Sequence, residues 1–150
     1  MSSKIHIRLL EADDIPIVAA LAKKNMIYPW SEQVFQDCMK ADYHAWVICD
    51  ADEVFGFVIV LNQLNECQLL NVCIDQQYQR AGYARQLLHY LFDEIRSQGL
   101  HRISLEVRRS NSAAIALYYA MGFIDVGLRK NYYPADLGRE DALIMMLELS

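Results

Sequence analysis

The sequence lacks long apolar runs, a signal peptide and an excess of basic residues. No apolar run approaches the ~20 residues that span a bilayer, and residues 1–6 contain no apolar core of the signal-peptide kind. We therefore expect a cytoplasmic protein with no membrane association. The 14 Lys and Arg against 19 Asp and Glu give a net charge of −5, which disfavours binding to the phosphates of nucleic acid.

Metal-binding motifs are absent too. The sequence has four cysteines, but no two form a C-x-x-C pair, and no histidine stands at metal-ligand spacing beside them. The H-E-x-x-H pattern does not occur either. We therefore expect no metal cofactor, and we interpret the cysteines as reduced, small side chains of the core. They are Cys38, Cys49, Cys67 and Cys73.

The length and composition are typical of one globular domain. A chain of 150 residues has the size of a single domain and buries about 68–70% of its unfolded surface when it folds. The 54% content of hydrophobic residues argues against disorder. We therefore expect residues 1–150 to form one domain, and we expect that domain to be a monomer or a weak dimer.

The chain is organised around residues 66–98, which predict a strand, a glycine-containing loop and a helix. The strand covers 66–75 and the loop covers 79–85. A loop that opens directly into a helix presents unpaired backbone N–H groups and the positive end of the helix dipole. This stretch therefore predicts an anion site suited to a phosphate or diphosphate. Apolar residues at three- and four-residue steps indicate the buried face of the helix; they are Leu87, Leu88, Leu91, Phe92 and Ile95.

The residues of the loop fit an anionic ligand. Gly82 lets the backbone approach closely and Ala84 keeps the next turn clear, while Arg80 and Arg85 supply positive charge for phosphate oxygens. The loop lacks the Gly-Lys-Ser/Thr of a Walker loop, and the G-x-G-x-x-G of a dinucleotide fold is absent. The predicted site therefore differs from both of those phosphate-binding types.

The remaining segments predict an α+β fold built around one mixed sheet. The element order is β-α-α-β-β-β-α-β-α-β-β, and the fifth strand is parallel to the fourth through a helical crossover. Residues 129–139 are expected to form a loop. Strands are expected at 4–9, 44–49, 54–61, 66–75, 101–107, 123–128 and 142–149. Helices are expected from the cap at 13–14 to Asn25, from Ser31 to about Met39 with Val34 and Phe35 facing inward, from the glycine loop to Gly99, and over 113–121.

The spacing Gln79-x-x-Gly82-x-Ala84, after an apolar strand and before an amphipathic helix, resembles the acyl-CoA pyrophosphate loop of the GNAT superfamily of N-acetyltransferases. The expected element order is similar to the GNAT order as well. Ala84 stands where RimI-type enzymes usually carry glycine, a change that the superfamily accepts. The resemblance covers nearly the whole chain and is weakest over 1–25 and 36–55. The segments that resemble the RimI branch are 28–31, 105–118, 121–123, 129–134 and 138–142.

This resemblance implies an enzyme that transfers an acetyl group from acetyl-CoA to the N-terminal α-amine of a protein. In RimI enzymes the acceptor is the N-terminal alanine of a small-subunit ribosomal protein. The amine must be neutral to attack the thioester. Because an α-amine has a pKa near 7.7–8.0 and a lysine amine one near 10.4, deprotonating lysine costs roughly 3.4 kcal/mol more. The α-amine is therefore the easier acceptor, a carboxylate base is sufficient, and we expect direct transfer in a ternary complex.

By the same resemblance, Glu106 is the general base and Tyr118 is the acid that protonates the departing CoA thiolate. From the alternating pattern alone, Glu106 would be a solvent-facing strand residue, and the surrounding motif favours the catalytic interpretation. Tyr119 competes with Tyr118, since one of the two faces the core and the other the cleft, and the resemblance selects Tyr118 by its Asn-x-x-Ala-x-x-Leu-Tyr context. Asn111 matches a family residue that touches the cofactor, although a helix N-cap alone explains it equally well.

The resemblance also assigns binding residues. The pantetheine arm is expected to add to the exposed edge of a bulged central strand through backbone hydrogen bonds, and an N–H there polarises the thioester carbonyl. The acceptor peptide is expected to bind in a groove formed by Tyr28, Tyr132 and Tyr133. Cys73 as an acetylated nucleophile is a lesser alternative, because the sequence places no histidine base near it. The residues implied to bind acetyl-CoA are Val72, Cys73, Ile74, Arg80, Ala81, Gly82, Tyr83, Ala84, Arg85 and Asn111.

Two other functions stay open at this point. One is a GNAT enzyme that acetylates lysine side chains or a small amine. The other is a non-catalytic regulator that binds acyl-CoA. The presence of both Glu106 and Tyr118 argues against the regulator.

Overall fold

The computed structural model describes residues 4–149, so residues 1–3 and 150 of the expected domain lie outside the described residues. The order of strands and helices is the predicted one. Short 3-10 turns at Ala12–Asp14 and Gln76–Tyr78 precede the first and third helices. The elements are β1 (Ile5–Leu9), α1 (Ile15–Asn25), α2 (Glu32–Asp37), β2 (Tyr43–Asp50), β3 (Glu53–Gln63), β4 (Glu66–Ile74), α3 (Tyr83–Ser97), β5 (Arg102–Arg108), α4 (Ser112–Ala120), β6 (Ile124–Ala135) and β7 (Gly138–Glu148).

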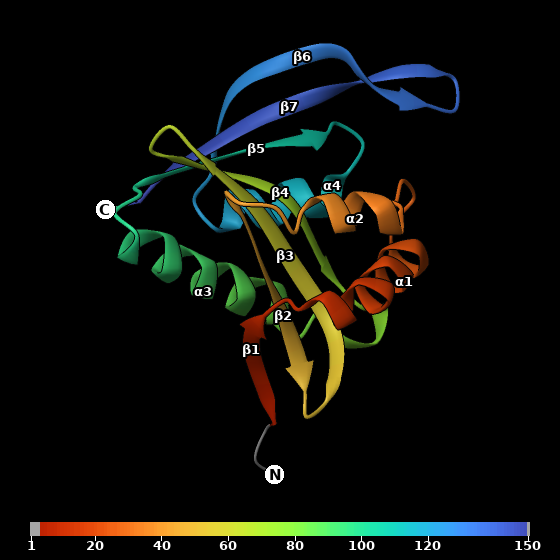
Figure 1. Cartoon of the computed structure of the whole chain (residues 1–150). Coiled ribbons are helices and arrows are strands. Elements are labelled where there is room, and N and C mark those ends of the chain that lie inside the picture. Colours follow the sequence, from red (N-terminus) through yellow and green to blue (C-terminus); the bar gives the residue numbers. More distant parts are fainter. Residues whose placement is uncertain (1–3, 150) are drawn as a thin grey trace.

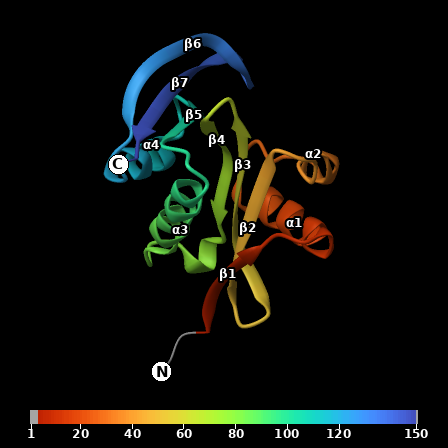
Figure 2. The same ribbon diagram turned by 60° about the vertical axis from the view of Figure 1, so that its left-hand side comes forward.

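The strands form one mixed sheet with helices on both faces (Figure 1). The strand order is β1-β2-β3-β4-β5-β7-β6, in which β4 and β5 run parallel. Figure 2 shows α1 and α2 on one face and α3 and α4 on the other. Each face has its own apolar core, one around α3 with Tyr118 of α4, the other around α1 with Phe35 of α2. The α+β fold is therefore confirmed, and the single-domain range 1–150 stays a prediction.

The central strand β4 separates from β5 partway along the sheet. Only three residue pairs join these strands among the described residues, and the last joins Leu69 to Leu105. The pairing of β3 with β4 shifts register at this point and leaves Leu70 as the extra residue of a bulge. Beyond it β4 stays paired with β3 while β5 continues along β7. The expected bulge and divergence are thus present, and Glu106 is the first residue of β5 past the last pair.

Polar contacts hold the end of α1 against the end of β4. The Asn25 side chain donates to Asp75 at 3.0 Å and accepts the Gln76 N–H at 2.9 Å, and Lys24 forms an ion pair with Asp75 at 3.1 Å. Burial raises the pKa of Asp75, but the hydrogen bonds from Asn25 and Lys24 outweigh it and leave that pKa below its usual value. Residues 26–31, which follow α1, therefore start from a fixed point beside the glycine loop.

Two local predictions are wrong. Residues 129–139 do not form a loop, because they continue β6 and begin β7 across a bulge between Arg129 and Tyr133. Pro134 is tolerated there because β6 is the edge strand and is paired on one side only, with β7. The second helix ends at Asp37 rather than near Met39. Its Phe35 is buried as predicted, but Val34 is exposed, since neighbouring helix positions point about 100° apart.

Within residues 4–149, no helix combines the length and the apolar character that crossing a bilayer requires.

Candidate active site

The glycine loop joins the carboxyl end of β4 to α3. Arg80 and Gly82 have positive φ angles of 66° and 84°, and these turns let α3 begin directly after Gly82. The N-cap has no side-chain hydrogen bond, and the helical hydrogen bonds begin with that of Gln86 to the Gly82 carbonyl at 3.0 Å. The N–H groups before Gln86 therefore point out of the helix end, as an anion site requires.

A pocket of about 200 Å³ opens at this end of α3. A Cβ added at Gly82 would meet no atom within 4 Å, so this glycine leaves open space on the ligand side. Tyr78, Gln79 and Leu117 complete the lining, whereas Ala81, Val72 and Cys73 lie next to the pocket in sequence without lining it. Six of the residues predicted to bind acetyl-CoA line the pocket: Ile74, Arg80, Gly82, Tyr83, Ala84 and Arg85.

Tyr78 supports the loop and was missed by sequence reasoning. Its ring stacks on Phe55 with the centroids 3.9 Å apart. Its hydroxyl donates at 3.2 Å to each of two carboxylates that flank the β2–β3 turn. The Gln79 side chain donates to the Ile74 carbonyl at 2.9 Å. Tyr78 and Gln79 therefore anchor the start of the glycine loop. The sequence signal for Tyr78 was its position directly before the motif that begins at Gln79.

Glu106 lies in a mostly enclosed position. Its side chain is 17% exposed, so the solvent-facing interpretation is wrong. The Tyr132 hydroxyl donates to Oε1 at 3.4 Å, and the Arg129 guanidinium forms an ion pair with Oε2. This ion pair lacks hydrogen-bond geometry, and no described residue donates a hydrogen bond to the buried Oε2. One ion pair and one hydrogen bond thus hold the carboxylate, and its remaining lone pairs can accept a substrate proton.

The two candidate catalytic residues come from opposite faces of the sheet. Leu105 and Val107 of β5 belong to the core around α3, so Glu106 between them faces α1 and α2. Tyr118 belongs to the core around α3. Tyr133 is within electrostatic range of both. Burial, and then the charge of Glu106, raise the pKa of Tyr133 to about 12, and Tyr133 contributes to the raised pKa of Tyr118.

The neighbouring tyrosines of α4 have different environments. Tyr118 is 7% exposed and packs against Phe123 with the ring centroids 5.5 Å apart. Burial raises the pKa of Tyr118 well above its usual value, so the hydroxyl keeps its proton at neutral pH. Tyr119 is 48% exposed and donates to the Asp125 carboxylate at 2.7 and 2.8 Å. Tyr119 therefore lies at the surface, and the acid role of Tyr118 stays a prediction.

The three tyrosines predicted to bind the peptide gather around two arginines that sequence reasoning missed. The guanidinium carbon of Arg108 lies 3.5 Å from the centre of the Tyr28 ring and 4.4 Å from that of Tyr133. Arg129 lies 5.0 Å from the centre of the Tyr132 ring, and the Tyr132 and Tyr133 rings are 4.9 Å apart. The structure thus brings the three tyrosines together. The signal for Arg108 was its position two residues after the candidate base, on the same face of the strand.

Asn111 and Cys73, both predicted to bind the cofactor, make structural contacts within the protein. Asn111 caps α4 by accepting the Ala114 N–H at 3.2 Å, so the N-cap interpretation is confirmed and its cofactor contact stays a prediction. Cys73 is 7% exposed and packs in the core around α1. Burial raises the pKa of its thiol to about 12, which makes it a poor nucleophile at neutral pH. All four cysteines are free and buried, as expected.

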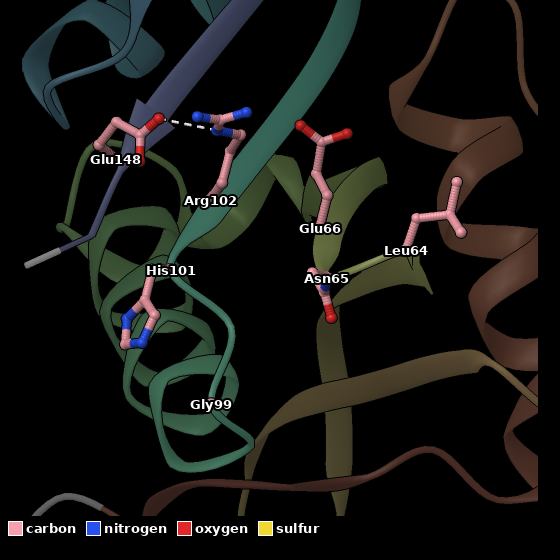
Figure 3. Close-up of a pocket in the computed structure, with 7 residues that line it drawn as sticks. All are labelled: Leu64, Asn65, Glu66, Gly99, His101, Arg102 and Glu148. Carbon is pink, nitrogen blue, oxygen red and sulfur yellow. Dashed lines mark hydrogen bonds and ion pairs between the residues drawn. The ribbon is translucent and has the colours of Figure 1, made fainter.

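A second hollow, of about 370 Å³, lies at the amino ends of β4 and β5, away from the gap between them. Figure 3 shows its polar lining, in which Arg102 donates to Glu148 at 2.7 Å. None of the site residues predicted from the sequence lines this hollow. Over residues 4–149, no group of three or more His, Cys, Asp and Glu side chains is arranged to hold a metal ion.

Comparisons with known proteins identify the family of this chain. Residues 15–123 match the Acetyltransferase (GNAT) family. The chain is 40% identical over 141 residues to the ribosomal protein bS18-alanine N-acetyltransferase of Escherichia coli K12. The aligned region covers 94% of this chain and 95% of that protein. The crystal structure of the E. coli ribosomal-protein-S18-alanine N-acetyltransferase matches with a TM-score of 0.91 at 39% identity, over 97% of this chain and 94% of that one.

A more distant structure shares the fold. Arabidopsis thaliana NAA60 in complex with acetyl-CoA matches with a TM-score of 0.87 at 17% identity, over 96% of this chain and 98% of that one. The family uses acetyl-CoA as its acetyl donor, and the pocket at the start of α3 offers the N–H groups and arginines that a diphosphate needs. On these grounds this chain belongs to the GNAT family of acetyltransferases and is an acetyl-CoA-dependent acyltransferase.

Proposed function

We propose that this enzyme acetylates the N-terminal α-amine of a protein, and that its acceptor is the N-terminal alanine of a small-subunit ribosomal protein. The observation that carries the proposal is the enclosed carboxylate of Glu106, which lies where β4 and β5 diverge and is held by Arg129 and Tyr132. The 40% identity to the E. coli bS18-alanine enzyme supports the choice of acceptor. On the same grounds we propose that the enzyme works in the cytoplasm.

The described residues fit acetyl-CoA. The diphosphate accepts hydrogen bonds from the N–H groups at the start of α3, while Arg80 and Arg85, both exposed, supply positive charge. The pantetheine arm extends along β4 beyond Leu70, where that edge is not paired with β5. The thioester is then held at the gap between the two strands, next to Glu106.

Transfer proceeds by direct attack. Glu106 accepts a proton from the ammonium group of the acceptor, either directly or through one water. The neutral nitrogen then bonds to the thioester carbon, and a backbone N–H of β4 donates to the carbonyl oxygen as its negative charge develops. The carbon–sulfur bond breaks as the carbonyl re-forms. The amine nitrogen gives its remaining extra proton to a solvent water, and the products are an acetylated N-terminus and the CoA thiolate.

Tyr118 returns a proton to the departing sulfur. Burial keeps its hydroxyl protonated until the thiolate forms. A buried phenol is a weak acid, but the same apolar surroundings also disfavour a charged thiolate and raise the pKa of the thiol. The proton moves from oxygen to sulfur, and the tyrosinate then regains a proton from solvent.

The test compares two synthetic peptides that begin Ala-Arg and contain one lysine, the first with a free N-terminus and the second with a blocked one. CoA release is followed with a thiol reagent. We expect turnover with the free peptide and at most a trace with the blocked one. Equal rates on the two would support lysine as the acceptor. Binding of acetyl-CoA without turnover on either would support the non-catalytic regulator.

A further inference from the structure

Arg108 joins parts of the chain that lie on two sides of the expected peptide groove. Its guanidinium carbon lies 3.5 Å from the centre of the Tyr28 ring and 4.4 Å from the centre of the Tyr133 ring. Tyr28 belongs to the segment 26–31 between α1 and α2, and Tyr133 belongs to β6. Because a guanidinium attracts aromatic faces on both of its sides, one side chain holds two segments that are distant in the sequence.

Further contacts fix the orientation of this guanidinium. Nη1 donates to the carbonyl of Pro134 at 2.7 Å and lies 3.5 Å from the Glu140 carboxylate. Glu140 is in turn held by the Ser110 hydroxyl at 3.0 Å. The Arg108 side chain is 17% exposed, so water competes weakly for these contacts. The planar group is therefore fixed in position by the hairpin of β6 and β7, and it presents a flat face to Tyr28.

The segment that carries Tyr28 needs such an anchor. Residues 26–31 form no helix or strand, and Tyr28 is itself 38% exposed. Asn25 fixes the start of this segment and the Ser31 cap of α2 fixes its end. Between those two points, Trp30 packs on Phe35 with the ring centroids 5.4 Å apart, and the contact with Arg108 holds the Tyr28 ring near Tyr133 of β6.

We propose that Arg108 is a positioning residue that sets the relative placement of Tyr28 and Tyr133 and thereby the affinity for the acceptor peptide. This inference rests on the proposed function, because it takes the two tyrosines as walls of the peptide groove. Arg108 does not touch the reacting atoms in this account. Its loss weakens peptide binding and leaves acetyl-CoA binding intact, since the acetyl-CoA pocket lies at the start of α3.

Lysine cannot replace arginine in this role. An ammonium keeps the charge but offers no flat face to stack between two rings and no fixed fork for the Pro134 carbonyl. Arg108→Lys is therefore expected to behave almost like Arg108→Gln. Arg109 is the matched control, since it is the next residue, its side chain is 66% exposed, and it forms a looser ion pair with Asp141 at 3.7 Å.

The experiment measures steady-state kinetics of wild type, Arg108→Lys, Arg108→Gln and Arg109→Gln with the free Ala-Arg peptide and acetyl-CoA. For both Arg108 variants we expect the KM for peptide to rise about tenfold, in line with the loss of two cation–π contacts. The KM for acetyl-CoA and kcat should change less than threefold, and Arg109→Gln should match wild type. An unchanged peptide KM in Arg108→Gln, or an equal rise in Arg109→Gln, overturns the proposal.

A second comparison separates positioning from general loss of structure. If Arg108 acts through Tyr28, then Arg108→Lys should add little to the peptide KM once Tyr28→Ala is present. Fully additive effects contradict that coupling. Calorimetry of peptide binding in the presence of CoA gives the same readout without turnover. If the wild-type enzyme shows no turnover with this peptide, the proposed function is refuted. The role of Arg108 is then still tested by the affinity for the peptide.

Discussion

Replacing Glu106 by Gln removes the proposed base and its ion pair with Arg129 while keeping nearly the same shape. The amide has nearly the shape of the carboxylate, and its carbonyl oxygen can still accept from the Tyr132 hydroxyl, now 3.4 Å from Oε1. What is lost is the negative charge of the carboxylate, which pairs with Arg129 through Oε2. General base catalysis contributes about 10²–10⁴-fold to rate. We therefore expect kcat/KM for peptide to fall by about 10²-fold or more at neutral pH.

The size of this loss should depend on pH. Without a base the variant can use only acceptor molecules that are already neutral. For an α-amine with a pKa near 7.8, the neutral fraction is about 9% at pH 6.8 and about 91% at pH 8.8. The kcat/KM of the variant should therefore rise about tenfold more than that of wild type from pH 6.8 to pH 8.8. The ratio of the wild-type to the variant kcat/KM should shrink by the same factor.

The assay is the initial rate of CoA release at subsaturating peptide between pH 6.5 and 9. Glu148→Gln serves as the control, since Glu148 pairs with Arg102 at the far end of the sheet and should leave the profile unchanged. Calorimetry with CoA checks that the cofactor pocket is intact. A Glu106→Gln enzyme with wild-type kcat/KM, or with a loss that is the same at every pH, would refute the proton-accepting role.

Three further predictions concern other parts of the molecule. Tyr118→Phe should slow transfer by about 10–100-fold without changing the affinity for CoA, measured by calorimetry, and an unchanged rate would remove Tyr118 as the acid. Gly82→Ala should weaken CoA binding, whereas Gly99→Ala, which has nearly the same φ (83° against 84°) and equally open space, should lose similar stability but bind CoA normally. Hydrogen bonds from Arg8 hold the pKa of Asp14 below its usual range, so the ionised carboxylate stabilises the fold above pH 4 and that contribution is lost as pH falls through the lowered value. Asp14→Asn should therefore lower the free energy of unfolding by about 1–3 kcal/mol at pH 7, with a difference that shrinks in acid; a constant difference in urea titrations would contradict this.

The glycine loop could be predicted from the sequence because its chemistry is local. An apolar strand, Gly82 and the amphipathic α3 lie next to one another in the chain, and the anion site consists of the backbone of that turn. The element order could be predicted for the same reason, because the local periodicity of each segment decides whether it forms a strand or a helix.

The surroundings of Glu106 could not be predicted in the same way. Arg129 and Tyr132 reach it from β6, and their register depends on a bulge that the sequence presents as a loop. Arg108 is a similar case, because its partners come from two separate segments. Which of Tyr118 and Tyr119 is buried also needed the structure, since α4 is apolar nearly all round and its periodicity selects no face.

The most direct test of the central claim is a competition within one peptide that carries both a free N-terminal alanine and an internal lysine. After incubation with the enzyme and acetyl-CoA at pH 7.5, fragmentation by mass spectrometry assigns the acetyl group to one amine or the other. The account predicts that the first acetyl group is found on the α-amine and that this product is lost in Glu106→Gln. Acetylation of the lysine first, or an α-amine product that does not depend on Glu106, would contradict it.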